Sequence, residues 1–149
     1  RQLTPLGGGG GGGPPNPYCL LDANPATGLD LSGLSPGGLS TSISGNLTGL
    51  VPSVHRPGRY AHYIVVTGLQ AGAMYQFTMQ SSPVFDTYMY LLSGPCSSDS
   101  IVTQDDDSAG SLQSKIIWTA TGSGDYSCEC TSYDSGVTGP FEFIAARLA

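Results

Sequence analysis

The sequence predicts an all-β protein, an antiparallel β-sandwich or jelly roll with an extended N-terminal arm. From Thr41 onward, apolar and polar residues alternate with a period of two in short segments, and turn residues separate these segments. No stretch has the 3.6-residue apolar period of an amphipathic helix. Short strands at this spacing are typical of antiparallel sandwiches and jelly rolls.

Each predicted strand is rich in β-branched or aromatic residues and ends at a turn signal. In 73–81, for example, Tyr75, Phe77 and Met79 alternate with their neighbours. The predicted strands are residues 60–68, 73–81, 86–94, 114–122, 124–133 and 140–148. Turn signals lie at 68–72, 93–98, 105–110, 122–124 and 134–139.

Composition divides the chain into an arm, a connecting segment and a β-domain. Residues 1–17 are rich in glycine and proline, the two residue types least suited to a helix. Residues 18–41 place leucines at loose intervals among Gly, Pro and Ser, which predicts irregular chain with at most one short strand, held at Cys19. Residues 42–149 form the predicted jelly-roll domain.

The low charge of the chain limits its partners. Only 11% of the 149 residues are charged, and the net charge is −6. The few basic residues cannot neutralise a row of phosphates, and no apolar run approaches the roughly 18 residues of a membrane span. We therefore expect no nucleic-acid partner and no membrane insertion. A surface poor in charge and rich in Ser, Thr and Gly is common in secreted and cell-surface proteins, so we expect an extracellular location.

The cysteines predict disulfides rather than a metal site. Their spacing contains no CxxC pair, and no histidine lies near any of them. A bond between Cys128 and Cys130 is disfavoured, because residues two apart on a strand are too splayed for relaxed disulfide geometry. We expect Cys19 and Cys96 each to pair with one member of the Cys128/Cys130 pair in an oxidising compartment. Four buried free thiols are the alternative.

The sequence lacks the pattern of a hydrolytic enzyme. It contains two histidines, His55 and His62, and no G-x-S-x-G nucleophile elbow. His62 lies in a strand pattern beside Tyr63, where a sheet-surface histidine is the ordinary case. Without a nucleophile–base constellation, we predict a non-enzymatic protein that requires no cofactor.

An acidic run is the one candidate metal site. Asp105, Asp106 and Asp107 offer hard oxygen ligands that could hold Ca²⁺, joined by Asp86 or Asp99. The alternative is a solvated hairpin loop in which the aspartates accept hydrogen bonds from backbone amides. Three adjacent carboxylates repel one another, which favours either a cation or full exposure.

Asn46 is the candidate site for an N-linked glycan. It begins the sequon N-L-T and is predicted to lie on an exposed turn. In an organism without the glycosylation machinery it is an ordinary turn asparagine. Covalent glycans on the Ser, Thr and Pro residues are also a prediction that the sequence leaves open.

Several motifs resemble the bacterial pre-peptidase C-terminal domain family over about residues 42–148. They are F-D-T-Y-x-Y-L at 85–91, D-D-D-S at 105–108 and T-A-x-x-S-G-x-Y at 119–126, and 43–49 resembles the family's opening strand. The resemblance implies a non-catalytic jelly-roll-like sandwich that accompanies secreted peptidases or binds surfaces such as collagen or polysaccharide, sometimes with calcium. Cys128 and Cys130 stand where the family usually has core aliphatics, which fits a buried disulfide.

The N-terminal arm allows two functions. In the first, it is an assembly device that adds a β-strand to a neighbouring copy, which gives a self-assembled extracellular filament. Leu3 and Leu6 would then be apolar anchors, and the glycines would lie flush against a sheet edge. The proposed contact residues are Leu3, Leu6, Gly7, Gly8, Gly9, Gly10, Gly11, Gly12, Gly13, Pro14 and Pro15. In the second, the arm is a passive linker and the domain is a secreted binding module, linked to or cleaved from a hydrolase.

Overall fold

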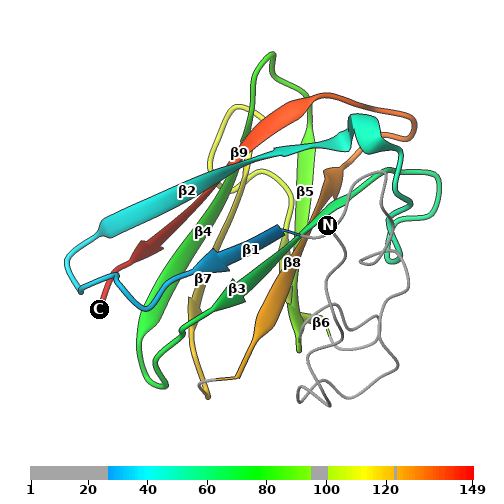
Figure 1. The fold of residues 1–149 in the computed structure, drawn as a ribbon. Coiled ribbons are helices and arrows are strands. Elements are labelled where there is room, and N and C mark those ends of the chain that lie inside the picture. The colour runs from blue at the N-terminus through cyan, green and yellow to red at the C-terminus, as the bar shows by residue number, and fades with distance from the viewer. Residues whose placement is uncertain (1–26, 95–100, 123) are drawn as a thin grey trace.

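The computed structural model describes residues 27–94, 101–122 and 124–149, which form two sheets packed face to face (Figure 1). The five-stranded sheet has the order β1-β3-β8-β5-β6, and the four-stranded sheet has the order β2-β9-β4-β7. The strands are β1 (Thr27–Asp30), β2 (Leu39–Asn46), β3 (His62–Thr67), β4 (Met74–Ser81), β5 (Thr87–Ser93), β6 (Ile101–Asp105), β7 (Ser114–Thr119), β8 (Tyr126–Ser132) and β9 (Pro140–Arg147). The predicted all-β sandwich is confirmed.

Helical structure is minimal in the part of the chain that the structure describes. Its one helical segment is the single 3-10 turn η2 (Leu47–Gly49). No helix in these ranges is long and apolar enough to cross a membrane.

Six observed strands lie within the predicted segments, whereas β1 and β6 were not placed by the sequence. β1 pairs with β3 in parallel, and all other strand pairs of the described residues are antiparallel. β1 is a short strand within the segment 18–41, for which the sequence allowed one, and it belongs to the five-stranded sheet. The boundary expected at residue 42 falls inside β2. β1 pairs with β3 and β2 with β9, which lie far away in the sequence, and local composition does not reveal such pairings.

The core lies between the two sheets and is built from the alternation that predicted the strands. Tyr75 and Phe77 of β4 point inward, and their rings stack with centroids 6.3 Å apart. Phe143 of β9 stacks on Phe77 at 5.7 Å. The opposite sheet contributes Met89, Leu91, Cys128 and Cys130, all fully buried.

The central strands of the five-stranded sheet are buried on both faces. Ile64 and Val66 of β3 face the core, yet Tyr63 and Val65, which face away from it, are at most 2% exposed. Residues 50–61, which connect η2 to β3, lie over part of this outer face, because Pro52 and Tyr60 form a bridge and Ser53 bonds to β8. This segment is called the covering loop below.

Candidate binding face

The covering loop is fixed to the sheet by one buried carboxylate. Glu129 of β8 points away from the core and is fully buried. Its Oε2 accepts hydrogen bonds from the Ser53 hydroxyl and, at 3.1 Å, from the backbone N–H of His55. Its Oε1 contacts Nδ1 of His55 at 2.6 Å. A buried charge is tolerated only when it is paired and hydrogen-bonded in this way, so Glu129 and the covering loop stabilise each other.

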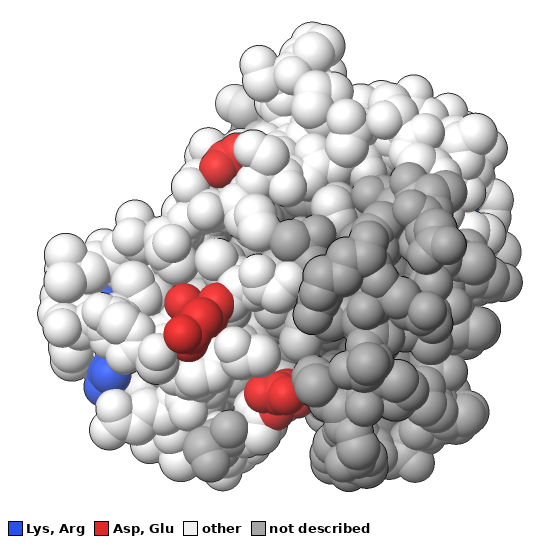
Figure 2. Space-filling model, in the orientation of Figure 1, with Lys and Arg blue, Asp and Glu red and all other residues white. Residues whose placement is uncertain are grey.

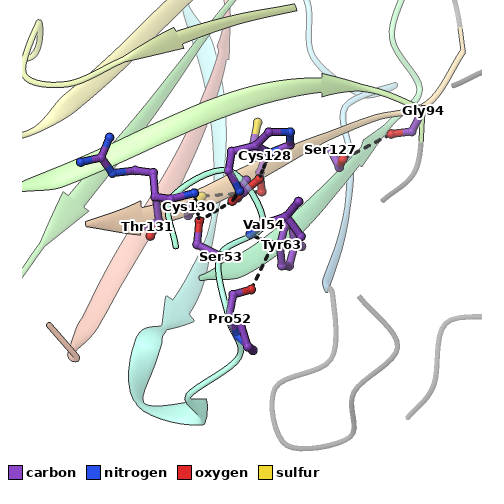
Figure 3. A network of polar contacts seen from close by, with 12 residues as sticks. Pro52, Ser53, Val54, Tyr63, Gly94, Ser127, Cys128, Cys130 and Thr131 are labelled. Carbon is purple, nitrogen blue, oxygen red and sulfur yellow. Dashed lines mark hydrogen bonds and ion pairs between the residues drawn. The ribbon is translucent and has the colours of Figure 1, made fainter. Parts of the chain in front are cut away.

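Further bonds hold the shape of the covering loop. The hydroxyl of Tyr63 donates to the carbonyl of Pro52 at 3.2 Å and accepts from the N–H of Val54 at 3.1 Å (Figure 3). The hydroxyl of Thr131 donates to the carbonyl of Tyr60 at 2.7 Å. The loop is therefore bound at its beginning, middle and end to β3 and β8.

Two arginines of the covering loop lie against two tyrosines, and we call Arg56, Arg59, Tyr88 and Tyr133 the arginine–tyrosine face. The Arg56 guanidinium lies 4.3 Å from the centre of the Tyr88 ring and 5.2 Å from that of Tyr133. Its Nε donates to the carbonyl of Ser132 at 3.1 Å and its Nη2 to that of Tyr133 at 2.8 Å. Nε of Arg59 donates to the same Tyr133 carbonyl at 3.0 Å. Arg56 is thus positioned by stacking and by backbone carbonyls, and Arg59 by backbone carbonyls.

The layer beneath this face is aromatic and buried. Tyr90 is 5% exposed, and its ring lies 5.3 Å from the His55 ring. Burial raises the pKa of the Tyr90 hydroxyl, while a hydrogen bond from Arg56 and the charge of Arg56 act in the opposite direction. Arg56 is therefore held between a buried layer and the surface, and Tyr133, which is 45% exposed, reaches solvent beside it.

Neither arginine of the face has a carboxylate partner among the described residues. Within residues 27–94, 101–122 and 124–149, the one ion pair joins His55 to Glu129. The chain as a whole is acidic, with a net charge of −6. On the side of the molecule shown in Figure 2, acidic groups are few and separated by uncharged residues among the described part. Arg56 and Arg59 thus bring positive charge to one face of a chain that is acidic as a whole.

Ser53, His55 and Glu129 meet in space, which the sequence did not predict, but their geometry is not that of a catalytic triad. The Ser53 hydroxyl donates to Glu129 and accepts from the N–H of Arg56 at 3.2 Å. A serine nucleophile must instead donate to a histidine nitrogen that removes its proton. The arrangement positions a loop, and it gives no observation in favour of hydrolysis.

The predicted disulfides are not found at the two cysteines that the structure describes. Cys128 and Cys130 are free thiols, fully buried, with both side chains on the core face of β8. Burial raises the pKa of both thiols, so they behave as small apolar core residues. The physical reason is their environment, which is filled by apolar side chains from both sheets. Cys19 and Cys96 lie outside the described residues, as does the proposed assembly arm at 1–17.

The first residue of the acidic run accepts hydrogen bonds within the hairpin loop and from β7. Asp105 accepts hydrogen bonds from the backbone N–H groups of Ser108 and Lys115, both at 2.9 Å, and from the Ser108 hydroxyl. No group of three or more His, Cys, Asp or Glu side chains in the described ranges is placed to hold a metal ion. Calcium binding at Asp105–Asp107 stays a prediction.

Asp106 lies close to Asp86, and its charge acts on that carboxyl. The Oδ1 atoms of Asp86 and Asp106 are buried and have no hydrogen-bond partner among the described residues. Burial, followed by the charges of Asp106, Asp134 and Asp107, raises the pKa of Asp86 to about 6.

Asn46 lies at the end of β2, where it caps η2. Its Oδ1 accepts from the N–H of Thr48 at 2.8 Å, and its own N–H donates to Nδ1 of His62 at 3.1 Å. His62 is 6% exposed, so the expected sheet-surface histidine is in fact a buried one. Asn46 is half-buried, and its glycosylation stays a prediction.

The fold is similar to two solved structures. The pre-peptidase C-terminal domain of a collagenase from Bacillus anthracis has a TM-score of 0.54 and 15% identity, and the match covers 81% of this chain and 95% of that one. PliG of Aeromonas hydrophila, a periplasmic lysozyme inhibitor of g-type lysozyme, has a TM-score of 0.55 and 12% identity, with 82% and 96% covered. No protein-family model and no curated protein sequence matches the chain.

These likenesses define the class of fold. At such low identities they concern the fold alone. The chain has a β-sandwich like that of a pre-peptidase C-terminal domain, in agreement with the motifs in its sequence.

The residues of the arginine–tyrosine face were absent from the sequence-based candidates. One signal was available: Arg56 and Arg59, two of the five basic residues of an acidic chain, lie three positions apart in a loop. The tyrosines that receive them come from β5 and the end of β8. Their proximity depends on strand order, which residue spacing does not encode.

Proposed function

We propose that this chain is a non-catalytic binding module of an exported protein, and that the arginine–tyrosine face contacts its ligand. The observation that supports this proposal is a positioned Arg56, stacked on Tyr88 and Tyr133 and without a carboxylate partner in the part of the chain that the structure describes. Tyrosine and arginine are the residue types that most often dominate binding energy at protein surfaces. The buried bonds of Glu129 preorganise the covering loop, which reduces the entropy lost on binding.

The comparisons support the binding reading over an enzymatic one. One similar structure is a domain attached to a collagenase, and the other is an inhibitor of g-type lysozyme. The classes of ligand worth testing are therefore fibrous proteins, polysaccharides and a lysozyme. The low charge of the chain is consistent with an extracellular or periplasmic location.

Pelleting assays with fibrillar collagen, cellulose and chitin, together with an activity assay of g-type lysozyme, test the proposal. We expect the full chain to bind or inhibit at least one of these probes. Replacing the exposed ring in Tyr133→Ala should weaken that interaction on the order of tenfold. Leu39→Ala is the matched control, because Leu39 is 56% exposed but lies on β2 of the other sheet. Equal behaviour of the two variants, or no interaction with any probe, would refute the proposal.

Self-assembly through residues 1–17 stays a second prediction about the whole chain. The described residues contribute one favourable observation, an edge strand β6 whose Ile101 and Val102 are 44% and 40% exposed. An exposed apolar edge accepts an added strand more readily than a charged one. Negative-stain microscopy of the chain without residues 1–13 tests the idea, because filaments from the truncated chain would contradict it.

A further inference from the structure

We propose that the arginine–tyrosine face recognises an acidic polysaccharide, through the carboxylates of its uronic-acid residues. This inference rests on the proposed function and names its class of ligand. Nη2 of Arg56 and Nε of Arg59 donate to the same carbonyl oxygen of Tyr133, at 2.8 and 3.0 Å, so the two guanidinium groups are neighbours. Neighbouring like charges repel each other, and a bound carboxylate would relieve that repulsion.

Arg59 has the donors for such a contact. Its Nε and Nη1 bond the carbonyls of Tyr133 and Pro57, at 3.0 Å each. Nη2 has no acceptor among the described residues, and no carboxylate there forms an ion pair with Arg59. The planar fork of a guanidinium matches a carboxylate, and charge-assisted bonds of this kind are about twice as strong as neutral ones.

The surroundings of the arginines favour a sugar over a peptide. Tyr133 offers an exposed ring to the apolar face of a pyranose. The hydroxyl of Tyr88 accepts a hydrogen bond from Nε2 of Gln104 at 2.8 Å. An amide and a phenol group therefore lie side by side, and both can form hydrogen bonds with sugar hydroxyls. Tyr88 belongs to β5, an interior strand between β8 and β6. An extended peptide is recognised through free backbone groups of a sheet edge, and an interior strand has none to offer.

The electrostatic attraction between this face and an anionic ligand must be confined to the two guanidinium groups. Asp134 follows Tyr133 directly, and the backbone carbonyl of Asp86 accepts from the N–H of Tyr133 at 2.9 Å. Acidic residues therefore border the face on this side. A ligand that places one or two carboxylates on the guanidinium groups and neutral ring atoms elsewhere suits this arrangement better than a uniformly dense polyanion.

The test is titration calorimetry of the full chain at low ionic strength against three polymers. These are polygalacturonate, its fully methyl-esterified form, and poly-L-glutamate. We expect binding of polygalacturonate, and about tenfold weaker binding of the methyl ester, which has the same sugar without the charge. Arg59→Ala should weaken binding of polygalacturonate by a similar factor. Lys115→Ala, on β7 of the other sheet, is the matched control and should bind as the wild type does.

Each outcome decides a separate point. Arg59→Lys retains the charge and should show intermediate affinity, and thermal melts of both Arg59 variants will show that the fold is kept. Equal affinity for the methyl ester would overturn the role of charge. Stronger binding of poly-L-glutamate would overturn the choice of a sugar. If none of the three polymers binds while a probe of the pelleting and lysozyme assays does so through Tyr133, this inference fails and the proposed function stands.

Discussion

The outer faces of the two sheets differ in what covers them. On the five-stranded sheet, Tyr63 and Glu129 point away from the core and are nevertheless fully buried. On the four-stranded sheet, Ser44 and Gln80 face solvent in the same row as Glu142, beside an open pocket of about 210 Å³. A strand buried on both faces needs a second layer, and here the covering loop supplies part of it.

Two glutamates, one on each sheet, illustrate this difference between the outer faces. Glu129 receives bonds from Ser53 and His55 on both of its oxygens. Glu142 is half-buried and accepts one bond, from the Ser44 hydroxyl at 2.9 Å. A solvated carboxylate tolerates missing partners, whereas a buried one does not. The bonds of Glu129 therefore hold the covering loop in one position. Because of this rigidity, the outer face of the five-stranded sheet is the better candidate for binding.

The largest expected effect comes from removing the buried carboxylate. Glu129→Ala leaves the Ser53 hydroxyl and the His55 N–H and ring nitrogen without their acceptor, and opens a cavity. We expect a loss of about 3–5 kcal/mol in the free energy of unfolding, measured by urea denaturation at pH 7. Binding at the arginine–tyrosine face should weaken as well, because Arg56 belongs to the released loop.

Glu142→Ala is the matched control for this prediction. It removes one exposed hydrogen bond on the other sheet, and we expect a change within about 0.5 kcal/mol. Equal losses for the two variants would show that Glu129 does not hold the covering loop, and the contrast between the two faces would have no energetic basis.

A second effect tests the tightly packed side of the four-stranded sheet. Gly45 of β2 pairs with Phe141 of β9, and the Phe141 ring lies over it. A methyl group in Gly45→Ala would come within 2.6 and 2.8 Å of two ring carbons. Since Phe141 is 4% exposed, the ring has little room to move. We expect a loss of about 1–3 kcal/mol in thermal or urea unfolding.

Gly28→Ala separates packing from backbone effects. A Cβ at Gly28 meets no atom within 4 Å, and this position, like Gly45, does not have a positive φ. We expect a change within about 0.5 kcal/mol. If both alanine variants lose the same amount, the loss is not caused by the Phe141 ring.

The strands of the fold could be predicted because their signal is local. A period of two in 73–81 places Tyr75 and Phe77 on one face whatever the rest of the chain does. β6 was missed because Ile101 and Val102 are exposed on an edge, and its alternation is weak. β1 was missed because its parallel partner β3 begins more than thirty residues later.

The candidate site could not be predicted, because its contacts join residues that are far apart in the sequence. Within 124–133, Glu129 has the position of an ordinary outward-facing polar residue. Its burial depends on Ser53, which is 76 residues away. The disulfide prediction is not supported at Cys128 and Cys130, which are free thiols, because an even number of cysteines says nothing about what packs around them. Cys128 and Cys130 share the core side of β8, where apolar neighbours surround both.

The smallest effect concerns Asp86, next to the arginine–tyrosine face. Its pKa is raised from 3.8 to about 6, so the folded state binds more protons than the unfolded state between pH 4 and pH 6. Stability attributable to this group is therefore present at low pH, falls as the pH rises through this window, and stays lower above it. Because the Asp86 side chain is only partly buried and solvent screens its charge, we expect only on the order of 1 kcal/mol.

Asp86→Asn should remove this loss, because the amide has no charge at any of these pH values and can donate to the Asp106 carboxylate. In thermal melts we expect the variant to exceed the wild type at pH 8 and to equal it at pH 4. Asp125→Asn is the control, since Asp125 is not among the charges that shift Asp86. A gain of equal size at both pH values would mean that the amide stabilises the fold through better hydrogen bonds, and that the repulsion between Asp86 and Asp106 has no part in it.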